Sequence, residues 1–287
     1  MDIRILHYFV TIAQEKNITR AAERLLITQP TLSRQLKELE EELGVSLFHR
    51  ANREMTLTED GQYLYNRAQE ILQLVSKTEE NLTRKGEIGG DLYIGTAETA
   101  SFDFVADACR SLLEIYPQIR LNFYDDNADS LYEKLDKGTL DFALVFTHAI
   151  PAKYKMIQLP RKDQWGVLVP KNHPLTKLEQ VTVEEIVSYP LIVSNQSDID
   201  KSAFANYDYK VVATYNLLYT ASRLVQAGLG IALCLDGIVD YPELVFLPCT
   251  NQGDEGFYLI WKDRHDQTAT EKAFLEEIEA QLYEIEN

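Results

Sequence analysis

The first 44 residues divide into three short segments with apolar residues at helical spacing, and this pattern limits the possible folds more than any other feature. In residues 2–16 the apolar positions are Leu6, Phe9, Val10 and Ala13, the i, i+3, i+4, i+7 pattern of an amphipathic helix. The spacing recurs over residues 18–25, and a third helix is expected from Thr28, with Pro30 in its first turn, to Gly44. Three such helices with a tight turn before the third predict a helix-turn-helix, whose third helix enters a DNA major groove N-terminal end first.

The third expected helix separates its charges along its length. Its apolar stripe, facing the core, is Leu32, Leu36, Leu39 and Leu43. Off this stripe, the first half carries side chains suited to base edges and phosphates, and the predicted DNA contacts there are Gln29, Pro30, Thr31, Ser33, Arg34 and Lys37. The second half carries Glu38, Glu40, Glu41 and Glu42. Because phosphates repel carboxylates, only the first two turns are expected to face DNA.

Residues 45–58 form two short apolar runs on either side of a polar tip at Asn52. This pattern predicts a β-hairpin, which after a helix-turn-helix would be a wing. Arg50 and Arg53 at the tip would contact phosphates or reach into a minor groove, where electrostatic attraction favours guanidinium groups. With Arg34 and Lys37 they make a modest positive footprint, so useful affinity is expected to need two copies of the chain.

Residues 59–85 contain no proline and a single glycine, which predicts one helix of about 40 Å. Its seam alternates steps of three and four residues: Gly61, Leu64, Ala68, Ile71, Val75, Thr78 and Leu82. So long a stripe is expected to pair with the same helix of a second chain; packing against the chain's own C-terminal part is the alternative. Gly86, Gly89 and Gly90 then break the helix and form a hinge.

Charge is distributed unevenly along the 287 residues, whose net charge is −17. Residues 1–58 hold eight Lys or Arg and eight Asp or Glu, whereas residues 91–287 hold sixteen and thirty-one. The acidity therefore lies almost entirely in the C-terminal two-thirds. The first 58 residues are expected to have a different kind of partner from the rest.

From residue 91 onward, strand-like and helix-like segments alternate in two sets. Apolar runs such as residues 142–146 are typical of strands covered on both faces and favour a parallel sheet. Two α/β units of this size predict a ligand site in the crevice outside the carboxyl ends of their strands.

Catalytic and metal-binding motifs are missing from the sequence. The five histidines are scattered, and there is no Walker loop, GxSxG or GxGxxG. We therefore expect no enzymatic activity, no cofactor and no metal. The cysteines Cys109, Cys234 and Cys249 form no CxxC pair and are expected to be buried in a reducing compartment. Neither a signal peptide nor a membrane-spanning run is found, which predicts a cytoplasmic protein without a membrane partner.

Residues 18–61, ITRAAERLLITQPTLSRQLKELEEELGVSLFHRANREMTLTEDG, resemble the N-terminal signature of the LysR-type transcriptional regulators. The resemblance rests on AAERL, TQPTLSRQLKELE, LGVSLFHR and LTEDG at their fixed spacings. In the wing, where the family often has Arg-Ser-Gly-Arg, this chain has Arg50-Ala51-Asn52-Arg53, which keeps both cations. The resemblance implies an α+β multidomain protein: a winged helix-turn-helix, a long linker helix, and a two-lobed α/β effector domain like the type II periplasmic binding proteins.

The residue patterns and the family resemblance together predict the domain boundaries. We expect a DNA-binding domain at 1–58, a dimerising linker helix and hinge at 59–90, and an effector-binding domain at 91–287. Within the last, lobe I is expected at about 91–160 and 266–287, and lobe II at about 161–265.

The resemblance also implies an effector held between the lobes. The positions that correspond to the family's effector contacts are Thr96, Glu98, Thr99, Ser101, Asn127, Phe146, Ser194, Asn195, Asn216 and Gly230. Helix N-termini favour anions, yet Glu98 would oppose an anionic effector. The hypothesis is therefore that the ligand carries an amine or hydroxyl groups, or that Glu98 is exposed. A further departure is Cys234-Leu235-Asp236, where relatives commonly have a proline after the strand.

Residues and resemblance together predict a sequence-specific transcriptional regulator whose promoter binding a small molecule modulates. Its expected partners are inverted-repeat double-stranded DNA, the effector, a second copy in a dimer or dimer of dimers, and RNA polymerase. Two alternatives remain open: a cytoplasmic solute-binding or sensor protein with an incidental helical N-terminus, and a redox-responsive regulator using Cys234 and Cys249.

Overall fold

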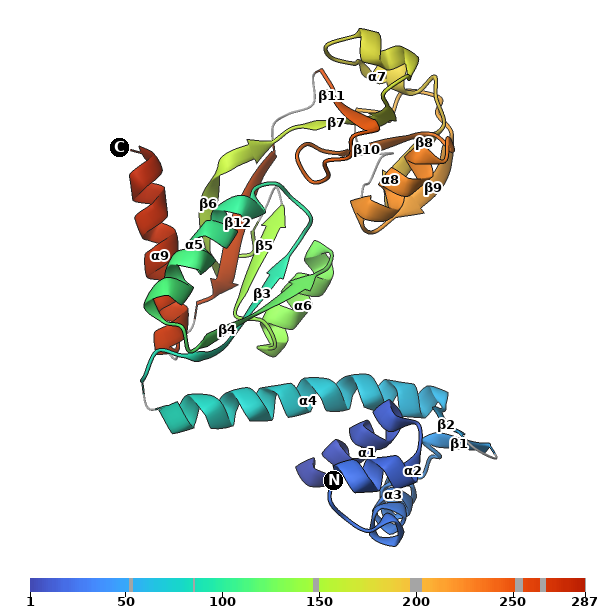
Figure 1. Ribbon diagram of the computed structural model, residues 1–287, viewed down its shortest axis with the longest axis vertical. Coiled ribbons are helices and arrows are strands. Elements are labelled where there is room, and N and C mark those ends of the chain that lie inside the picture. The colour runs from blue at the N-terminus through green and yellow to red at the C-terminus, as the bar shows by residue number, and fades with distance from the viewer. Residues whose placement is uncertain are drawn as a thin grey trace. The chain divides into compact units, whose positions relative to one another are not determined.

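The computed structural model of the chain describes residues 1–51, 54–84, 86–146, 150–196, 203–250, 255–263 and 267–286. Its contacts divide the chain into two compact units, Met1–Lys85 and Gly86–Asn287. Figure 1 shows the elements of both. Among the described residues, no helix is both long and apolar enough to cross a bilayer.

The first unit is a winged helix-turn-helix followed by a long helix, as expected. Its elements are α1 (Ile3–Glu15), α2 (Ile18–Arg24), α3 (Gln29–Leu43), β1 (Phe48–Ala51), β2 (Glu54–Leu57) and α4 (Glu59–Arg84). The apolar stripes of the three short helices meet in one core, which contains Phe9 and Leu36. The Phe9 ring lies 5.4 Å from that of Phe48, so the same core also holds the base of the wing.

Local signals set the ends of these helices. Asp2 caps α1 by accepting a hydrogen bond from Arg4 N (2.8 Å), and Asn17 caps α2. Gly44 ends α3 in the left-handed conformation, with a φ of 71°. Thr28 occupies the N-cap position of α3, but its hydroxyl pairs with that of Thr31 (2.8 Å) and makes no capping hydrogen bond.

Helix α4 divides its expected seam between two environments. The Thr58 hydroxyl caps the helix by accepting from Gly61 N (2.9 Å). A Cβ at Gly61 would lie 2.0 Å from the Leu47 carbonyl oxygen, so only glycine allows α4 to start this close to the wing. Ala68 is buried against the core of the first unit, whereas the Leu82 side chain is 72% exposed. The first half of the seam therefore packs within its own unit.

The first sheet of the second unit, here called lobe I, has the strand order β4-β3-β5-β12-β6. Its strands are β3 (Gly90–Thr96), β4 (Ile119–Asp125), β5 (Phe142–Phe146), β6 (Tyr154–Asp163) and β12 (Glu255–Lys262). Helices α5 (Phe102–Ile115) and α9 (Ala269–Glu286) cover one face, and α6 (Ala128–Lys137) covers the other (Figure 1). Phe142 and Leu144 pack in the first of these cores, and Ala143 and Val145 in the second.

The second sheet, lobe II, has the order β11-β7-β10-β8-β9. Its strands are β7 (Trp165–Pro170), β8 (Leu191–Ser194), β9 (Val211–Tyr215), β10 (Ile231–Leu235) and β11 (Leu244–Pro248). Its helices are the short 3-10 helix η1 (Pro174–Lys177), α7 (Val183–Ile186) and α8 (Leu218–Gln226). Helix α8 packs on one face of the sheet, while η1 and α7 pack on the other.

Two expectations about these sheets were wrong. Both sheets are mixed: β3 pairs in parallel with β4 and β5, but β12 pairs antiparallel with β5 and β6. An apolar run shows that a strand is covered on both faces, not which way its neighbours run. Strand β12 also belongs to lobe I, although residues up to 265 were expected in lobe II, and β6 extends lobe I to Asp163. The long β6–β12 pairing holds these strands in lobe I.

Candidate DNA interface and effector site

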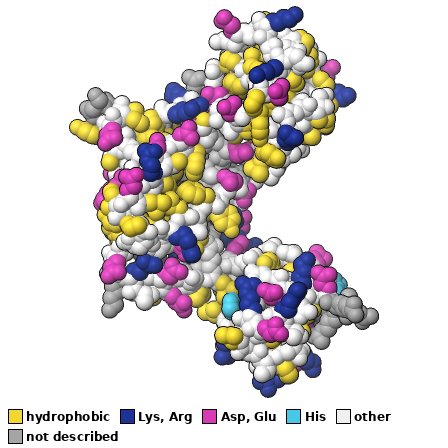
Figure 2. Space-filling model, in the orientation of Figure 1, with side chains coloured by type: hydrophobic (Ala, Val, Ile, Leu, Met, Phe, Trp, Pro, Cys, Tyr) yellow, Lys and Arg dark blue, Asp and Glu magenta, His cyan; other side chains and the backbone are white. Residues whose placement is uncertain are grey.

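Helix α3 presents the first half of its polar face to solvent. Leu32, Leu36 and Leu39 are buried and fix the rotation of the helix. Of the predicted DNA contacts on this helix, Ser33 is partly buried and the others are exposed: Gln29, Pro30, Thr31, Arg34 and Lys37. The Arg34 and Lys37 side chains are each 70% exposed. On the visible face of the first unit, Lys and Arg side chains are interspersed with Asp and Glu (Figure 2).

Both cations of α3 have acidic partners one turn further along the helix. Arg34 Nε lies 3.7 Å from Glu38 Oε1, and Lys37 Nζ lies 3.2 Å from Glu41 Oε1. Gln35 Nε2 also donates to Glu38 Oε2 (2.6 Å). Exposed pairs at this spacing contribute about 0.3–0.5 kcal/mol. The cations can therefore exchange a glutamate for a phosphate at small cost.

The wing is an antiparallel hairpin in which Phe48 pairs with Leu57 and Ala51 with Glu54. Met55 N donates to the Lys16 carbonyl (3.0 Å), which attaches the wing to the end of α1. The predicted tip contact Arg53 lies outside the described residues. For Arg50 the structure describes the backbone in β1.

Two residues of the DNA-binding unit have features that the sequence did not predict. Glu40, first grouped with the repelled carboxylates of α3, accepts a hydrogen bond from Leu47 N (2.8 Å) and so ties α3 to the wing. Leu26, in the turn between α2 and α3, has a φ of 55° and is 93% exposed. Leucine rarely adopts this left-handed conformation, which favours glycine and asparagine.

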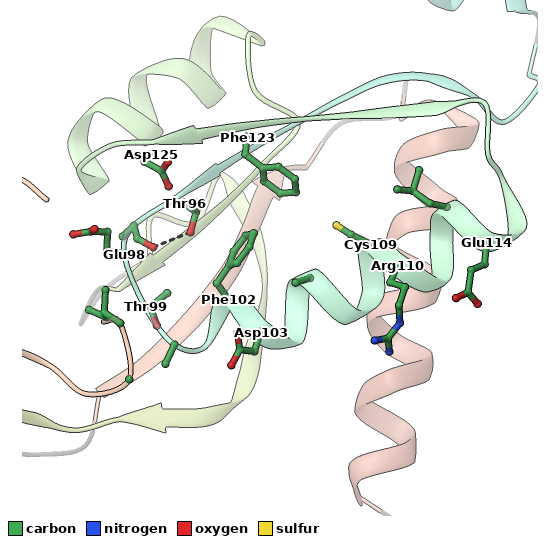
Figure 3. A pocket seen from close by; sticks show the side chains of 16 residues that line it. Thr96, Glu98, Thr99, Phe102, Asp103, Cys109, Arg110, Glu114, Phe123 and Asp125 are labelled. Atoms are coloured by element: carbon green, nitrogen blue, oxygen red, sulfur yellow. Dashed lines mark hydrogen bonds between the residues drawn. The ribbon is translucent and has the colours of Figure 1, made fainter. Parts of the chain in front are cut away.

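In the second unit, a groove of about 950 Å³ starts at the carboxyl end of β3 and continues along α5 and β4. Thr96, Glu98 and Thr99 line its start, and Figure 3 shows Phe102 and Phe123 facing each other further along. Their ring centroids are 5.4 Å apart. Hydrophobic side chains also gather over lobe I in Figure 2. Three of the ten predicted effector contacts therefore share one concave surface.

One of these three, Thr99, and a fourth predicted contact, Ser101, bind a buried carboxylate that the sequence did not predict. The Thr99 and Ser101 hydroxyls both donate to Asp163, the Ser101 bond being 2.8 Å long. Asp163 ends β6 and is 0% exposed. No periodicity or motif marks it in the sequence, because its partners lie more than 60 residues earlier in the chain.

Arg161 extends this cluster across the point where the chain passes from lobe I to lobe II. Its Nε donates to Asp163 Oδ1 (3.2 Å), and its Nη2 donates to Asp236 Oδ2 (2.8 Å), just after β10 of lobe II. Asp236 Oδ1 also accepts from Gln164 N (2.8 Å). The position noted in the sequence as lacking the family's proline is thus a carboxylate that joins the two lobes.

Glu98 extends from the loop after β3 away from α5 (Figure 3) and contacts lobe II. Its Oε2 accepts a hydrogen bond from Leu218 N, the first residue of α8, at 2.6 Å. Burial raises the pKa of the Glu98 carboxyl, and the charge of Asp125 adds to this, while the Leu218 hydrogen bond lowers it. Glu98 is half-buried and bonded to lobe II, so it is not exposed in the way that one of the two sequence hypotheses required.

The remaining predicted effector contacts lie at element ends and mostly have structural partners. Asn127 caps α6 by accepting from Ser130 N (2.9 Å). Ser194 Oγ accepts from Gln196 N (3.2 Å), and Asn195 N donates to the Tyr215 carbonyl (2.8 Å). The last three are Phe146, whose ring lies 5.9 Å from that of Phe257; Asn216, which is exposed; and Gly230, where a Cβ would lie 2.3 Å from the Pro190 oxygen.

The cysteines are buried and poorly placed for redox chemistry. Burial raises the pKa of the Cys234 thiol to about 12 and that of Cys249 to about 11. Cys234 and Pro248 pair with Gly166 of β7 from opposite sides, so Cys234 lies two strand spacings, about 10 Å, from the strand that leads into Cys249. A disulfide requires Cα atoms within about 7 Å. The two thiols also pack in different cores of lobe II.

Comparison with solved structures supports this architecture. The crystal structure of CbnR, a LysR family transcriptional regulator, superposes with a TM-score of 0.75 over 98% of this chain and 99% of CbnR, at 19% identity. CbnR complexed with its target DNA has also been solved, and its TM-score is 0.74 at 18% identity. A winged helix-turn-helix joined to an effector-binding unit defines a DNA-binding transcriptional regulator, not an enzyme.

Residues 3–62 match the bacterial regulatory helix-turn-helix protein model of the lysR family, and residues 85–282 match the LysR substrate binding domain. The chain therefore belongs to the LysR family. It is 32% identical to the HTH-type transcriptional regulator AlsR of Bacillus subtilis (strain 168) over 67% of this chain and 64% of AlsR. It is 28% identical to the DNA-binding transcriptional dual regulator OxyR of Escherichia coli (strain K12) over 87% of this chain and 85% of OxyR.

Proposed function

We propose that two copies of this regulator, or a dimer of dimers, bind an inverted-repeat promoter site in the cytoplasm through their winged helices. The observation that carries the proposal is the exposed first half of α3, where Arg34 and Lys37 point to solvent while the leucine stripe is buried. Base and phosphate contacts are assigned to Gln29, Pro30, Thr31, Ser33, Arg34 and Lys37, and wing contacts to Arg50 and Arg53. RNA polymerase is the expected partner at the promoter.

The second half of α4 supports the pairing of two chains. Leu82 and Ile71, on the expected heptad seam, are exposed, whereas the earlier seam residue Ala68 is buried. An apolar stripe that its own unit does not cover is suited to the same stripe on a second copy. Each chain offers few cations to DNA, and pairing doubles the number that one duplex can contact. More phosphate contacts give higher DNA affinity.

The effector is proposed to bind between the lobes, at the carboxyl ends of the strands. At this edge of lobe I, Glu98 follows β3, Asp125 is the last residue of β4, and Asp126 comes directly after it. Their charges favour a ligand that carries an amine or hydroxyl groups over a dicarboxylate. Such an effector would alter DNA binding only if it bound one arrangement of the assembly more tightly than the other.

The two alternatives are weaker. An incidental helical N-terminus does not account for residues 3–62, which match the family's DNA-binding model. Redox sensing is considered because the relatives include OxyR and proteins named as hydrogen peroxide-inducible genes activators. The buried, separated thiols of Cys234 and Cys249 do not favour it here.

A gel-shift assay with the full chain and the DNA upstream of its own and neighbouring genes tests the DNA-binding proposal. We expect a discrete shifted complex that competitor DNA of unrelated sequence does not displace. Equal displacement by any DNA would contradict it.

Calorimetric titration of the full chain with amine-bearing, polyhydroxylated and dicarboxylate metabolites tests the effector proposal. We expect binding from the first two classes. Tight binding of a dianion that Glu98→Gln leaves unchanged would overturn the assignment.

A further inference from the structure

Helix α8 begins without a cap of its own. Its N-cap residue is Leu217, which has no side-chain acceptor. The first N–H groups of a helix have no partner within it and usually take one from a Ser, Thr, Asp or Asn at the N-cap. Leu218 N instead donates to Glu98 Oε2 (2.6 Å), from a residue 120 positions earlier in the other lobe. Lobe I thus supplies the cap that lobe II lacks.

The hydrogen bond is charge-assisted, because a negative carboxylate meets the positive end of a helix. The N-terminus of a nine-residue helix carries a partial positive charge, which a carboxylate stabilises. Burial of the carboxylate opposes this stabilisation. Within the described part of the chain, the ionisable groups that interact with Glu98 are Asp125 of lobe I and Tyr215 and Cys234 of lobe II. The partial charge of the helix end therefore stabilises the contact, and burial of the carboxylate weakens it.

The lobes also meet closely on the loop after β10. A Cβ at Gly237 would lie 2.8 Å from the Ala100 Cβ and 2.9 Å from Arg161 Nη2. Gly237 has a φ of 70°, so glycine suits both its backbone and its surroundings. Ala100 lies two residues after Glu98, so the loop that carries Glu98 contacts lobe II at two places.

We propose that Glu98 is a latch between the lobes: its carboxylate caps α8 and holds the loop after β3 against lobe II. An effector that enters between the lobes must either break this contact or bind beside it. The latch concerns the same crevice as the proposed effector site, but the contact joins two parts of this chain, so it can be tested without knowing the effector.

Hydrogen exchange by mass spectrometry on the full-length, effector-free protein tests the latch, with Glu98→Ala and Glu98→Gln compared to the natural chain. In Glu98→Ala we expect exchange to rise about tenfold in three segments that the latch holds together: residues 96–101, residues 217–221 and residues 235–238. Glu98→Gln should stay close to the natural protein, because its amide oxygen still accepts from Leu218 N. Glu133→Ala, which removes an exposed carboxylate paired with Lys137 on α6, is the matched control.

Two results would overturn the proposal. Unchanged exchange in Glu98→Ala would show that the contact does not hold the loop after β3 against lobe II. A rise confined to residues 217–221 would show that Glu98 only caps α8 and does not join the lobes. Unchanged exchange of the β3 and β8 strands would show that each variant is folded. A failure of DNA binding or of effector binding would leave these outcomes unaffected, so the latch and the proposed function fail separately.

Discussion

In the first unit, the cations Arg34 and Lys37 are 70% exposed and have acidic neighbours on their own helix. In the second unit, the carboxylate of Asp163 is fully buried and its partners come from distant segments. Exposed charges one turn apart cost little to separate, whereas a buried charge that loses its partners is costly. Substitutions in the first unit should therefore change binding without unfolding the protein, and substitutions in the second should change stability or the contact between the lobes.

The largest effect is expected at Asp163. Asp163→Ala leaves the Thr99 and Ser101 hydroxyls buried without their acceptor and removes one partner of Arg161, so we expect a loss of about 2–4 kcal/mol in the free energy of unfolding. Urea unfolding followed by tryptophan fluorescence measures it, because both tryptophans, Trp165 and Trp261, lie in the second unit.

Asp107→Ala is the matched control for Asp163, since Asp107 is an exposed aspartate paired with Arg110 on α5. It should change the unfolding free energy by less than about 0.5 kcal/mol. If the two variants lost the same small amount, the buried cluster would not stabilise the second unit as described.

The next effect concerns DNA discrimination. Arg34→Ala should reduce the preference for the specific site over unrelated DNA by about 1–3 kcal/mol, because a guanidinium that contacts a base edge is lost. Gel shifts at one fixed salt concentration measure this preference. Arg110→Ala, which removes a cation from the second unit, should leave it unchanged. Specific binding that survives Arg34→Ala would remove Arg34 from the reading face.

A different kind of loss is expected at the wing. Arg53→Ala should weaken binding to all duplexes about equally and lower the salt slope by about 1 per chain, because a phosphate contact releases about one counterion. Affinity measured against salt concentration gives the slope. A slope equal to that of the natural protein would assign Arg53 no phosphate.

In the first unit, the sequence predicted those features for which the residue pattern and the structure it produces lie within a few residues of each other. The leucine stripe of α3, the stop at Gly44 and the hairpin after it are examples. In the second unit, Thr99 and Ser101 are themselves among the positions expected for effector contacts, but nothing in the sequence pointed to their partner Asp163. Glu98 and Leu218 lie 120 residues apart. Pairing at such distances depends on how the sheets pack, which no local pattern reveals.

A pH titration sharpens the comparison at Glu98. Burial between the lobes raises the pKa of this carboxyl above its ordinary value, so the latched arrangement binds a proton more tightly than one in which Glu98 is hydrated. Lowering the pH through the carboxyl range should therefore favour the latch, and raising it should loosen it. Exchange of residues 217–221, corrected for intrinsic rates, should show this trend in the natural protein. A trend equally steep in Glu98→Gln would assign it to another group.

The smallest effect is expected at Leu26. Leu26→Asn places a residue that tolerates a positive φ at 55° and removes an exposed leucine, so the first unit should gain about 0.5–1 kcal/mol. Amide exchange of α2 and α3 in the full chain should slow accordingly. Leu26→Ala separates the two causes, since it removes the leucine without relieving the backbone. An equal gain in both variants would show that the backbone conformation costs little.

The central claim is that two or four copies of α3 are presented to one duplex. Sedimentation velocity of the full-length protein with a labelled duplex from upstream of its own gene tests it most directly, because the mass of the complex counts the chains. We predict two or four chains per duplex, and an assembled state before DNA is added. A single chain per duplex, formed from monomers with site-specific affinity, would contradict the account.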